Sequence, residues 1–448
     1  MVVPRPALQG DLSTGVCIVG GGLTGLWTAY YLKKADPSLE ITVLEKQVAG
    51  FGASGRNGGW CSALFPKSAE ALRRAYGDDA ARALRSTMID TVDEVGRVAA
   101  AEGIDCDFVK GGTLVFARDT VQRAAAQSEV DAAREFGVDD LELVTPGGRD
   151  DAHARALAAT SSLAASFDPA CARLHPAKLV RGLARVVEEL GVTIAEQTEA
   201  VEWAPGRVLY SGAGGQGLVS CETVVLAVEA YGATMPGIGR RILPLYSLMI
   251  ATEPLSDQVW DDLGIEHGTT FSDYRHLLVY GQRTADNRFA FGGRGARYHW
   301  GSSIRPEYDR VDRVFDHLES TLGELFPAVK GTPVTHRWGG PLGVPRDWHP
   351  TASYNPRTGI AYAGGYVGDG LSTTNLAGRT LAQLITRQET ELTRLPWVNH
   401  LSRRWEREPL RFAGANLGLI GTEAADVEES VTGRRSLAAR LLAPLTGH

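Results

Sequence analysis

Three glycines near the start of the chain are spaced in a way that suits a phosphate site. Gly20, Gly22 and Gly25 end the apolar run 16–20 and open a stretch, 23–34, with apolar residues at helical spacing. The first glycine permits a tight turn, the second leaves room for a pyrophosphate and the third lets helix and strand pack closely, while the helix N-terminus offers N–H donors. The pattern therefore predicts a strand, turn and helix that bind a dinucleotide.

A carboxylate stands where the ribose of such a dinucleotide would lie. Glu45 follows a second strand expected over 40–44 (EITVL) and comes twenty residues after Gly25. A carboxylate at the end of the second strand accepts hydrogen bonds from ribose hydroxyls. We expect Leu23, Thr24 and Lys46 to border the same site.

A second match to the glycine pattern, at Gly212, Gly214 and Gly217, has different flanks. The runs RVLYS and LVSCETVVLAV surround it, and these predict strand, turn and strand without a helix to offer its N-terminus. We expect a hairpin loop there. Without a second dinucleotide unit or a CxxxxC pair, a disulfide reductase with two nucleotides is disfavoured.

The loop GASGRNGGW after Glu45 indicates FAD rather than NAD. It combines small residues, a cation and an amide, which can supply N–H donors to phosphate and bring the backbone close to an isoalloxazine ring. An ordinary surface turn is the alternative. The residues expected to contact the cofactor here are Ala53, Ser54, Gly55, Arg56, Asn57, Gly58, Gly59 and Trp60.

Composition bounds the remaining possibilities. The 448 residues exceed a usual single domain, and the net charge of −7 gives no reason to expect nucleic acid as a partner. No signal peptide and no run of 18 apolar residues is visible, so we expect a cytoplasmic protein that does not contact membrane. Five cysteines without a CxxC pair suit a reducing compartment and predict no metal site.

The order of elements predicts an α/β fold in which a second domain interrupts the first. We expect a long helix over 72–101, hairpin strands over 109–118, and a helix over 176–191. Alternating strands follow, such as 246–252, 276–280 and 289–292, then helices over 309–325 and 375–386. We assign residues 1–100, 150–240 and 340–448 to a discontinuous FAD-binding domain with a C-terminal helical tail, and 101–149 and 241–339 to a substrate domain.

The ASGRNGG loop and four further segments resemble the D-amino-acid oxidase superfamily of FAD-dependent oxidoreductases. The loop is most similar to the gamma-glutamylputrescine oxidoreductase branch, beside the glycine and sarcosine oxidases. The other segments are HPAKLVRGLA, GVTIAEQTEAVEW, VVLAVEAYG and GGYVGDGLSTTNLAGRTLA, and together they reach from residue 16 to about 386. The resemblance implies a Rossmann-like FAD-binding domain with an interleaved antiparallel-sheet substrate domain.

The resemblance also implies cofactor contacts late in the chain. They are Ala200, Ala227, Ala230, Gly365, Val367, Gly368, Asp369, Gly370 and Leu371. The last of these stand at the start of a helix, whose N-terminus would stabilise the negative charge of a reduced flavin. Asp369 departs from the family pattern, and it either contacts substrate or caps the helix, the cap being the more ordinary role.

The positions of the cysteines bear on whether FAD is attached covalently. Some sarcosine-oxidase relatives link FAD to a cysteine in the C-terminal third, but the last cysteine here is Cys221. Cys61 adjoins the RNGGW loop, where a structural thiol is more plausible than a covalent link. We predict dissociable FAD.

The family's reaction is oxidation of a C–N bond in an amine or amino acid. Hydride passes to flavin N5, the imine hydrolyses to a carbonyl compound, and oxygen or another acceptor reoxidises the flavin. One alternative is an FAD monooxygenase using NAD(P)H, although such enzymes usually carry a GDAAH-like segment where this chain has GGYVGDGLSTTN. A second is a flavin-binding subunit of a larger dehydrogenase, and the oligomeric state is left open.

The substrate should lie between the second domain and the glycine segments that face the ring. The candidates for contact are Trp60, Tyr246, Met249, Tyr274, Tyr280, Arg294, Trp338 and Asp369. Each aromatic residue has a role in the core as its alternative. Arg294 could bind a substrate carboxylate or pair with one of the protein. His175 precedes a helix, which favours a role at the helix start over catalysis.

Overall fold

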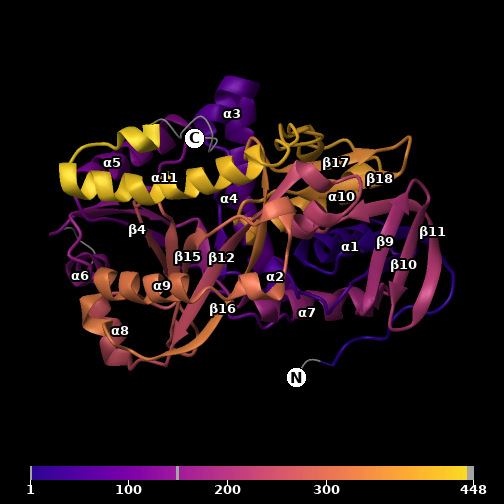
Figure 1. Cartoon of the computed structure of the whole chain (residues 1–448), viewed down its shortest axis with the longest axis horizontal. Helices are drawn as coiled ribbons and strands as arrows, with labels where there is room; N and C mark the ends of the chain where they lie inside the picture. Colours follow the sequence, from indigo (N-terminus) through magenta and orange to yellow (C-terminus); the bar gives the residue numbers. More distant parts are fainter. Residues whose placement is uncertain (1–2, 148–150, 441–448) are drawn as a thin grey trace.

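The computed structural model describes residues 3–147 and 151–440. Residues 1–2 and 441–448 at the two ends of the chain lie outside this description. So does the expected domain boundary at 149 and 150. Two large sheets lie side by side, one with β9, β10, β11, β17 and β18 on the right of Figure 1 and the other with β4, β12, β15 and β16 on the left.

The first sheet carries the dinucleotide motif. Its order is β17-β18-β11-β1-β2-β8, and every neighbouring pair is parallel except β17 with β18. The strands are β1 (Leu12–Val19), β2 (Ile41–Leu44), β8 (Thr193–Ala195), β11 (Gly215–Leu226), β17 (Thr351–Asn355) and β18 (Ile360–Gly364). The hairpin expected at Gly212 is confirmed, because β10 (Arg207–Gly212) pairs antiparallel with β11 and β9 (Thr198–Ala204) extends it.

Helices cover this sheet and build the larger core. α1 (Leu23–Ala35) packs against α7 (Pro176–Glu189) and α10 (Gly370–Ile385). α10 approaches closely, because a Cβ on Gly378 would lie 2.6 Å from the backbone of Trp27. The helix expected over 72–101 is two helices, α3 (Ala69–Tyr76) and α4 (Asp78–Ala101), because Gly77 between them has a φ of +91°.

The second sheet has the order β16-β12-β15-β14-β13-β4-β6-β5. Its strands are β4 (Thr113–Ala117), β5 (Glu142–Val144), β6 (Ala164–Asp168), β12 (Ile242–Thr252), β13 (Thr270–Asp273), β14 (Val279–Arg283), β15 (Phe289–Ala296) and β16 (Val334–Pro345). The pairs are antiparallel apart from β13 with β4. Helices α5 (Thr120–Glu135), α6 (Asp151–Ala159), α8 (Asp257–Leu263) and α9 (Asp312–Leu325) belong to this half.

Two strand expectations were wrong in this sheet. Residues 109–118 do not form a hairpin of their own, because β4 pairs with the distant strands β13 and β6. Residues 276–278 precede β14 instead of belonging to it, since the N–H groups of His276 and Leu277 bond to Asp426 and not to a neighbouring strand. β6 lies in the second sheet although residues from 150 onward were assigned to the FAD-binding domain.

The C-terminal helix lies over the second half of the molecule. α11 (Leu410–Thr432), yellow in Figure 1, crosses above β4, β15 and β12. The tail was assigned to the FAD-binding domain, yet the backbone of His276 and Tyr298 binds side chains of this helix. A short antiparallel pair is formed by β3 (Trp60–Ser62) and β7 (Cys171–Arg173). In this pair β3 contacts α10 and α4, and β7 contacts β13 of the second sheet.

Candidate active site

The turn between β1 and α1 requires glycine at two of its positions. Gly20 has a φ of +110°, and a Cβ there would collide with the carbonyl oxygen of Ala227. A Cβ on Gly25 would collide with the carbonyl oxygen of Gly20. Gly22 is the N-cap of α1 and lacks a side chain that could occupy the helix start. The turn is therefore shaped to bring a phosphate onto the helix N-terminus.

Glu45 is held at the end of β2 by backbone donors. Its Oε2 accepts a hydrogen bond from the N–H of Gly21 at 2.9 Å, and its Oε1 accepts one from Gln47 at 2.8 Å. Burial raises the pKa of this carboxyl, and the two N–H groups oppose that shift. The carboxylate borders the cavity, where it is placed to accept hydrogen bonds from ribose hydroxyls.

The loop after Glu45 folds into a single helical turn, α2 (Ala53–Arg56). The Ser54 hydroxyl accepts a hydrogen bond from the N–H of Leu23 at 2.9 Å, which joins this loop to the start of α1. Asn57 donates to the carbonyl of Ala53 at 3.0 Å and accepts from the N–H of Gly59 at 2.9 Å. The amide thus fixes the loop, and the glycines bring its backbone to the cavity.

Arg56 joins the two halves of the molecule. Its Nη1 forms an ion pair with Asp309 at 2.6 Å and donates to the carbonyl of Gly339 at 3.0 Å. Trp338 Nε1 in turn donates to the backbone carbonyl of Arg56 at 2.8 Å. The loop is therefore clamped against β16 and the short helical turn η4 (Pro306–Asp309).

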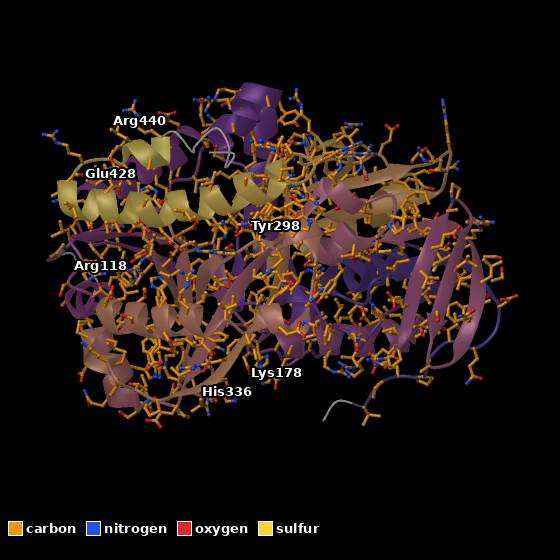
Figure 2. All side chains as sticks on the ribbon, viewed as in Figure 1. Arg118, Lys178, Tyr298, His336, Glu428 and Arg440 are labelled. Atoms are coloured by element: carbon orange, nitrogen blue, oxygen red, sulfur yellow. The ribbon has the colours of Figure 1, made fainter. Side chains whose placement is uncertain are left out.

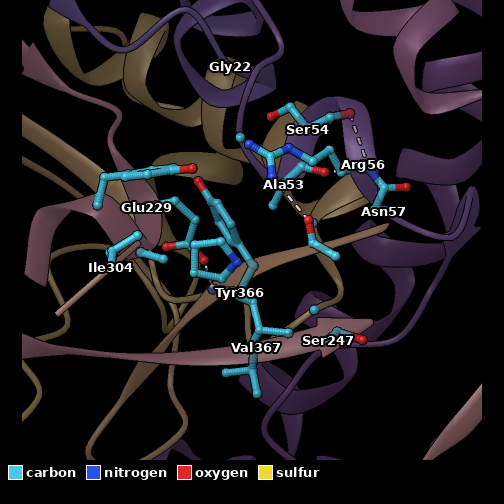
Figure 3. Close-up of a pocket in the computed structure, with 18 of the residues that line it drawn as sticks. Gly22, Ala53, Ser54, Arg56, Asn57, Glu229, Ser247, Ile304, Tyr366 and Val367 are labelled. Atoms are coloured by element: carbon cyan, nitrogen blue, oxygen red, sulfur yellow. Dashed lines mark hydrogen bonds between the residues drawn. The ribbon is translucent and has the colours of Figure 1, made fainter. Parts of the chain in front are cut away.

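The segment between β18 and α10 forms the other wall of the cavity. Gly365, Val367 and Gly368 have φ values of +84°, +58° and +117°, which keep the backbone in a left-handed path. Figure 3 shows Tyr366 and Glu229 on one side of the cavity and Ser54, Arg56 and Asn57 on the other. The turn and this segment therefore face each other across one space.

Glu229 holds this segment in place and was missed from the sequence. Its carboxylate accepts hydrogen bonds from the N–H groups of Gly365 at 3.1 Å, Tyr366 at 3.3 Å and Gly343 at 3.3 Å. Burial raises its pKa to about 7, and the three N–H groups oppose the shift. The available signal was an acidic residue directly after the buried run VVLAV.

Asp369 occupies the N-cap position of α10, but its side chain makes no cap hydrogen bond. Burial raises the pKa of this carboxyl to about 6, and the charge of Arg294 opposes the shift. The carboxyl borders the cavity. The sequence left two roles open for Asp369, contact with substrate or a helix cap. The side chain does not act as a helix cap.

Arg294 reaches the same part of the cavity from β15. Its Nη2 donates to the carbonyl of Val367 at 2.9 Å, and its guanidinium lies 5.3 Å from the centroid of the Trp348 ring. Burial lowers the pKa of this side chain, while the charge of Asp369 opposes that shift. A cation and a carboxyl thus border one buried space.

Aromatic residues line the cavity on the side of the second sheet. Tyr280 exchanges a hydrogen bond with the Ser247 hydroxyl at 2.8 Å, and the Trp60 ring meets Tyr280 edge to face at 6.1 Å. Trp60 Nε1 donates to the carbonyl of Gly281 at 3.1 Å. These bonds fix the rings, so this wall is rigid.

The structure brings most of the expected site residues to one cavity of about 1540 Å³. The expected residues that line it are Gly20, Gly22, Leu23, Thr24, Glu45, Lys46, Ala53, Ser54, Arg56, Asn57, Gly58, Trp60, Ala200, Ala227, Ala230, Tyr280, Arg294, Trp338, Val367, Gly368, Asp369, Gly370 and Leu371. The volume exceeds the roughly 300–1,000 Å³ of a usual small-molecule site. It therefore suits a long cofactor with a second molecule beside it.

Other expected residues lie behind that lining. Gly25, Gly55, Gly59 and Gly365 shape the loops. Tyr246 is 1% exposed and packs in the core of the second half. Met249 is also 1% exposed, and its methyl group lies beside Gly58. Tyr274 donates to Glu129 and to Ser166. Lining residues that the sequence did not single out include Glu229, Ser247, Arg275, His276, Leu278, Ile304 and Trp348.

Comparison with known proteins now decides the family. The family model for FAD-dependent oxidoreductases matches residues 15–384. The chain belongs to this family. It is 31% identical over 397 residues to gamma-glutamylputrescine oxidoreductase of Escherichia coli, covering 85% of this chain and 86% of that protein. It is 23% identical over 403 residues to the sarcosine oxidase beta subunit of Rhodobacter capsulatus, covering 86% of each.

A solved structure agrees on the fold. Glycine oxidase from Geobacillus kaustophilus superposes with a TM-score of 0.69 at 20% identity, covering 87% of this chain and all of that one. The expected fold class, the FAD-dependent oxidoreductase activity and the family resemblance are confirmed. These comparisons give the monooxygenase alternative no support.

The residues present fit FAD. A turn that admits only glycine, a carboxylate at the end of β2 and a left-handed backbone segment opposite form one continuous cradle. The residues that would hold the adenosine and pyrophosphate are those of the β1 turn, Glu45 and α2. The residues that would hold the flavin ring are those from Val367 to Leu371.

Several other expectations can be compared with the described residues. His175 accepts a hydrogen bond from the N–H of Lys178 at 3.4 Å, as a residue at a helix start does. All five cysteines are free and buried. Within residues 3–147 and 151–440, acidic, His and Cys side chains form no group that could hold a metal. No helix in these ranges has the length and apolar character needed to cross a membrane.

Proposed function

We propose that this protein oxidises the C–N bond of an amine or amino acid whose nitrogen lies at Asp369 and whose carboxylate, where it has one, lies at Arg294. The observation that carries the proposal is a pair of opposite charges on the lining of one cavity, Asp369 at the start of α10 and Arg294 on β15. When bound, FAD supplies the acceptor for the hydride that leaves the carbon bearing the nitrogen, and the resulting imine hydrolyses to a carbonyl compound.

Asp369 has the properties of a proton acceptor for the substrate. An amine arrives at neutral pH as an ammonium ion, and its nitrogen must lose a proton before its lone pair can assist the oxidation. With a pKa of about 6, Asp369 is ionised at pH 7 yet remains a better base than an exposed aspartate. The ionised carboxylate attracts the ammonium group and can take its proton.

Arg294 has the properties of an anchor for an oxygen of the substrate. Nη2 is engaged by the Val367 carbonyl, which fixes the planar fork above the Trp348 ring. A guanidinium fixed in this way binds a carboxylate or an amide oxygen with little loss of side-chain entropy. Tyr280 and Trp60, fixed by their own hydrogen bonds, line the same cavity and reduce the space open to water.

The named relatives support an amine substrate. One is a gamma-glutamylputrescine oxidoreductase, one a sarcosine oxidase subunit, and a structural neighbour is a glycine oxidase. All three names describe compounds that carry an amino group. We propose small amines and amino acids as the substrate class, with oxygen or another electron acceptor as the second reactant.

We further propose that FAD is held without a covalent bond. Cys61 is the middle residue of β3 and is fully buried, and the lining of the cavity includes no cysteine among the described residues. Burial raises the pKa of the Cys61 thiol, which disfavours the reactive thiolate. Acid precipitation should leave the yellow colour in the supernatant, and colour in the pellet would contradict this proposal.

The function is tested by anaerobic mixing of the purified yellow protein with amines, amino acids and N-methyl amino acids. We expect at least one class to bleach the visible absorption of the flavin in a single turnover. If every class leaves the flavin oxidised while NADPH reduces it, the proposal is wrong. If the isolated protein is inert but gains turnover with a second polypeptide, the chain is a flavin-binding subunit of a larger enzyme; the sarcosine oxidase relative is named as a subunit.

A further inference from the structure

The C-terminal helix α11 lies outside the part of the chain that matches the family, which ends at residue 384. Even so, it forms part of the cavity wall. Thr422 and Ala425 of α11, and Ala439 after it, border the same cavity as Gly20 and Asp369. This part of the wall is therefore an addition to the family domain.

The C-terminal half of α11 is fixed to the loop before β14. The Asp426 carboxylate accepts hydrogen bonds from the N–H of His276 at 2.6 Å and from that of Leu277 at 2.9 Å. Glu429 lies 3.1 Å from the imidazole Nε2 of His276. One aspartate thus binds two consecutive backbone donors, which sets the height of the helix above the loop.

The N-terminal half is fixed in the same way at a second point. Asn416 accepts from the N–H of Tyr298 at 3.1 Å and donates to its carbonyl at 3.2 Å. Glu408, just before the helix, accepts from the Tyr298 hydroxyl at 2.7 Å and from the N–H of Gly301 at 3.1 Å. Tyr298 and Glu428 mark the two ends of the helix in Figure 2. The helix is therefore a fixed wall.

The face that α11 turns toward the cavity is small and lacks charge. The Thr422 hydroxyl donates to the carbonyl of Leu419 in its own helix at 2.8 Å, and Ala425 carries only a methyl group. Leu278, Arg294 and Trp348 belong to the other walls of the same cavity. A wall of this kind leaves room for an aliphatic chain, with Arg294 as the donor for an oxygen along that chain.

We propose that α11 forms one wall of a subsite for the part of the substrate remote from the reacting nitrogen, and that it selects amines with an extended, acylated chain over short alkylamines. The inference rests on the proposed oxidation of amines. It goes beyond it by assigning chain-length selection to Thr422 and Ala425, which lie outside the family domain. The fixed height of the helix sets the width available to the chain.

The test compares two substrates with the same reacting end, gamma-glutamylputrescine and butylamine, in three variants. Thr422→Trp fills the subsite, Ala424→Trp places the same ring on the exposed side of the helix, and Asp426→Asn weakens the attachment to the loop. We expect Thr422→Trp to raise KM for gamma-glutamylputrescine about tenfold and to leave butylamine within about twofold. Asp426→Asn should bring the KM values for the two amines closer together. Ala424→Trp should have the same KM values as the parent protein.

Other outcomes would overturn the proposal. One is an equal rise in KM for both substrates in Thr422→Trp, and another is no rise for either. The third is the same selective rise in KM for gamma-glutamylputrescine in Ala424→Trp. Perturbation of the flavin spectrum on titration with each amine provides a binding measurement that needs no turnover. If neither amine reduces the flavin, the proposed oxidation of these amines fails, whereas the binding titrations still decide whether α11 selects for chain length.

Discussion

Arg294 and Val367 join the second sheet to the segment between β18 and α10 through one hydrogen bond of 2.9 Å, from Nη2 to the backbone carbonyl. Val367 has a φ of +58°, so the carbonyl is presented by a strained turn next to Gly368. The guanidinium therefore has two functions. It holds the turn before α10, and it offers its remaining donors to the cavity.

Replacing Arg294 separates these two functions. Arg294→Gln should raise KM about 100-fold for amino acids, because a charge-assisted pair with the carboxylate is lost, and should have a smaller effect on butylamine. Arg294→Lys keeps the charge but not the planar fork, so its KM for amino acids should lie between those of the parent protein and Arg294→Gln. Steady-state kinetics with glycine and butylamine check this, and equal losses for both would show that Arg294 acts only on the turn.

Asp369 should set the acid limb of the pH profile. Because burial raises its pKa to about 6, the carboxyl is neutral below that pH and ionised above it, so kcat/KM should rise through about pH 6. Asp369→Asn should remove this limb and lower kcat/KM about 100-fold, while Asp369→Glu should retain the limb. A limb that persists in Asp369→Asn would assign the titration to another group.

The cofactor side of the site could be predicted from sequence because its constraints are local. Gly20, Gly22, Gly25 and Glu45 belong to one βαβ unit, in which spacing alone places a turn, a helix start and a carboxylate at the end of the second strand. The flanks of Gly212 likewise distinguished a hairpin from a second nucleotide site. The matching segment after β18 completed the cradle.

The lining on the side of the second sheet could be predicted only in part, because it depends on which face of a strand points inward. Tyr246 was a candidate and Ser247 was not, yet Ser247 borders the cavity and Tyr246 is 1% exposed in the core. Successive residues of a strand point to opposite faces, so an error of one residue exchanges core and site. The contacts of Glu229 and Asp426 join residues more than 100 positions apart, and no local pattern encodes them.

Two glycine-to-alanine substitutions should have opposite effects. A Cβ on Gly25 would collide with the backbone carbonyl of Gly20, whereas a Cβ on Gly418 in α11 would meet nothing within 4 Å. Gly25→Ala should abolish FAD retention on gel filtration, since the turn must shift. Gly418→Ala should retain FAD and raise the free energy of unfolding by about 0.5–1 kcal/mol, because alanine favours the helix. Retention of FAD by Gly25→Ala would contradict the assigned turn.

Glu229 should make the stability of the apoprotein depend on pH. Its pKa is raised from 4.5 to about 7, so the folded state favours the protonated form. The resulting stabilisation is fully present below about pH 4.5 and is lost as the pH rises through about 7, by up to about 3 kcal/mol. Urea unfolding at pH 5 and pH 8 measures this difference.

Glu229→Gln supplies the comparison. Its amide cannot ionise, so the variant should lose that part of the pH dependence. It should also be less stable than the parent at pH 5. In the parent, the carboxyl group accepts hydrogen bonds from backbone N–H groups, whereas the NH2 group of glutamine is itself a donor and cannot accept them. The difference between the two proteins should therefore shrink toward pH 8. The free energies of unfolding of the two proteins could instead differ by the same amount from pH 5 to pH 8. That result would show that Glu229 keeps an ordinary pKa and that its three hydrogen bonds offset the effect of burial.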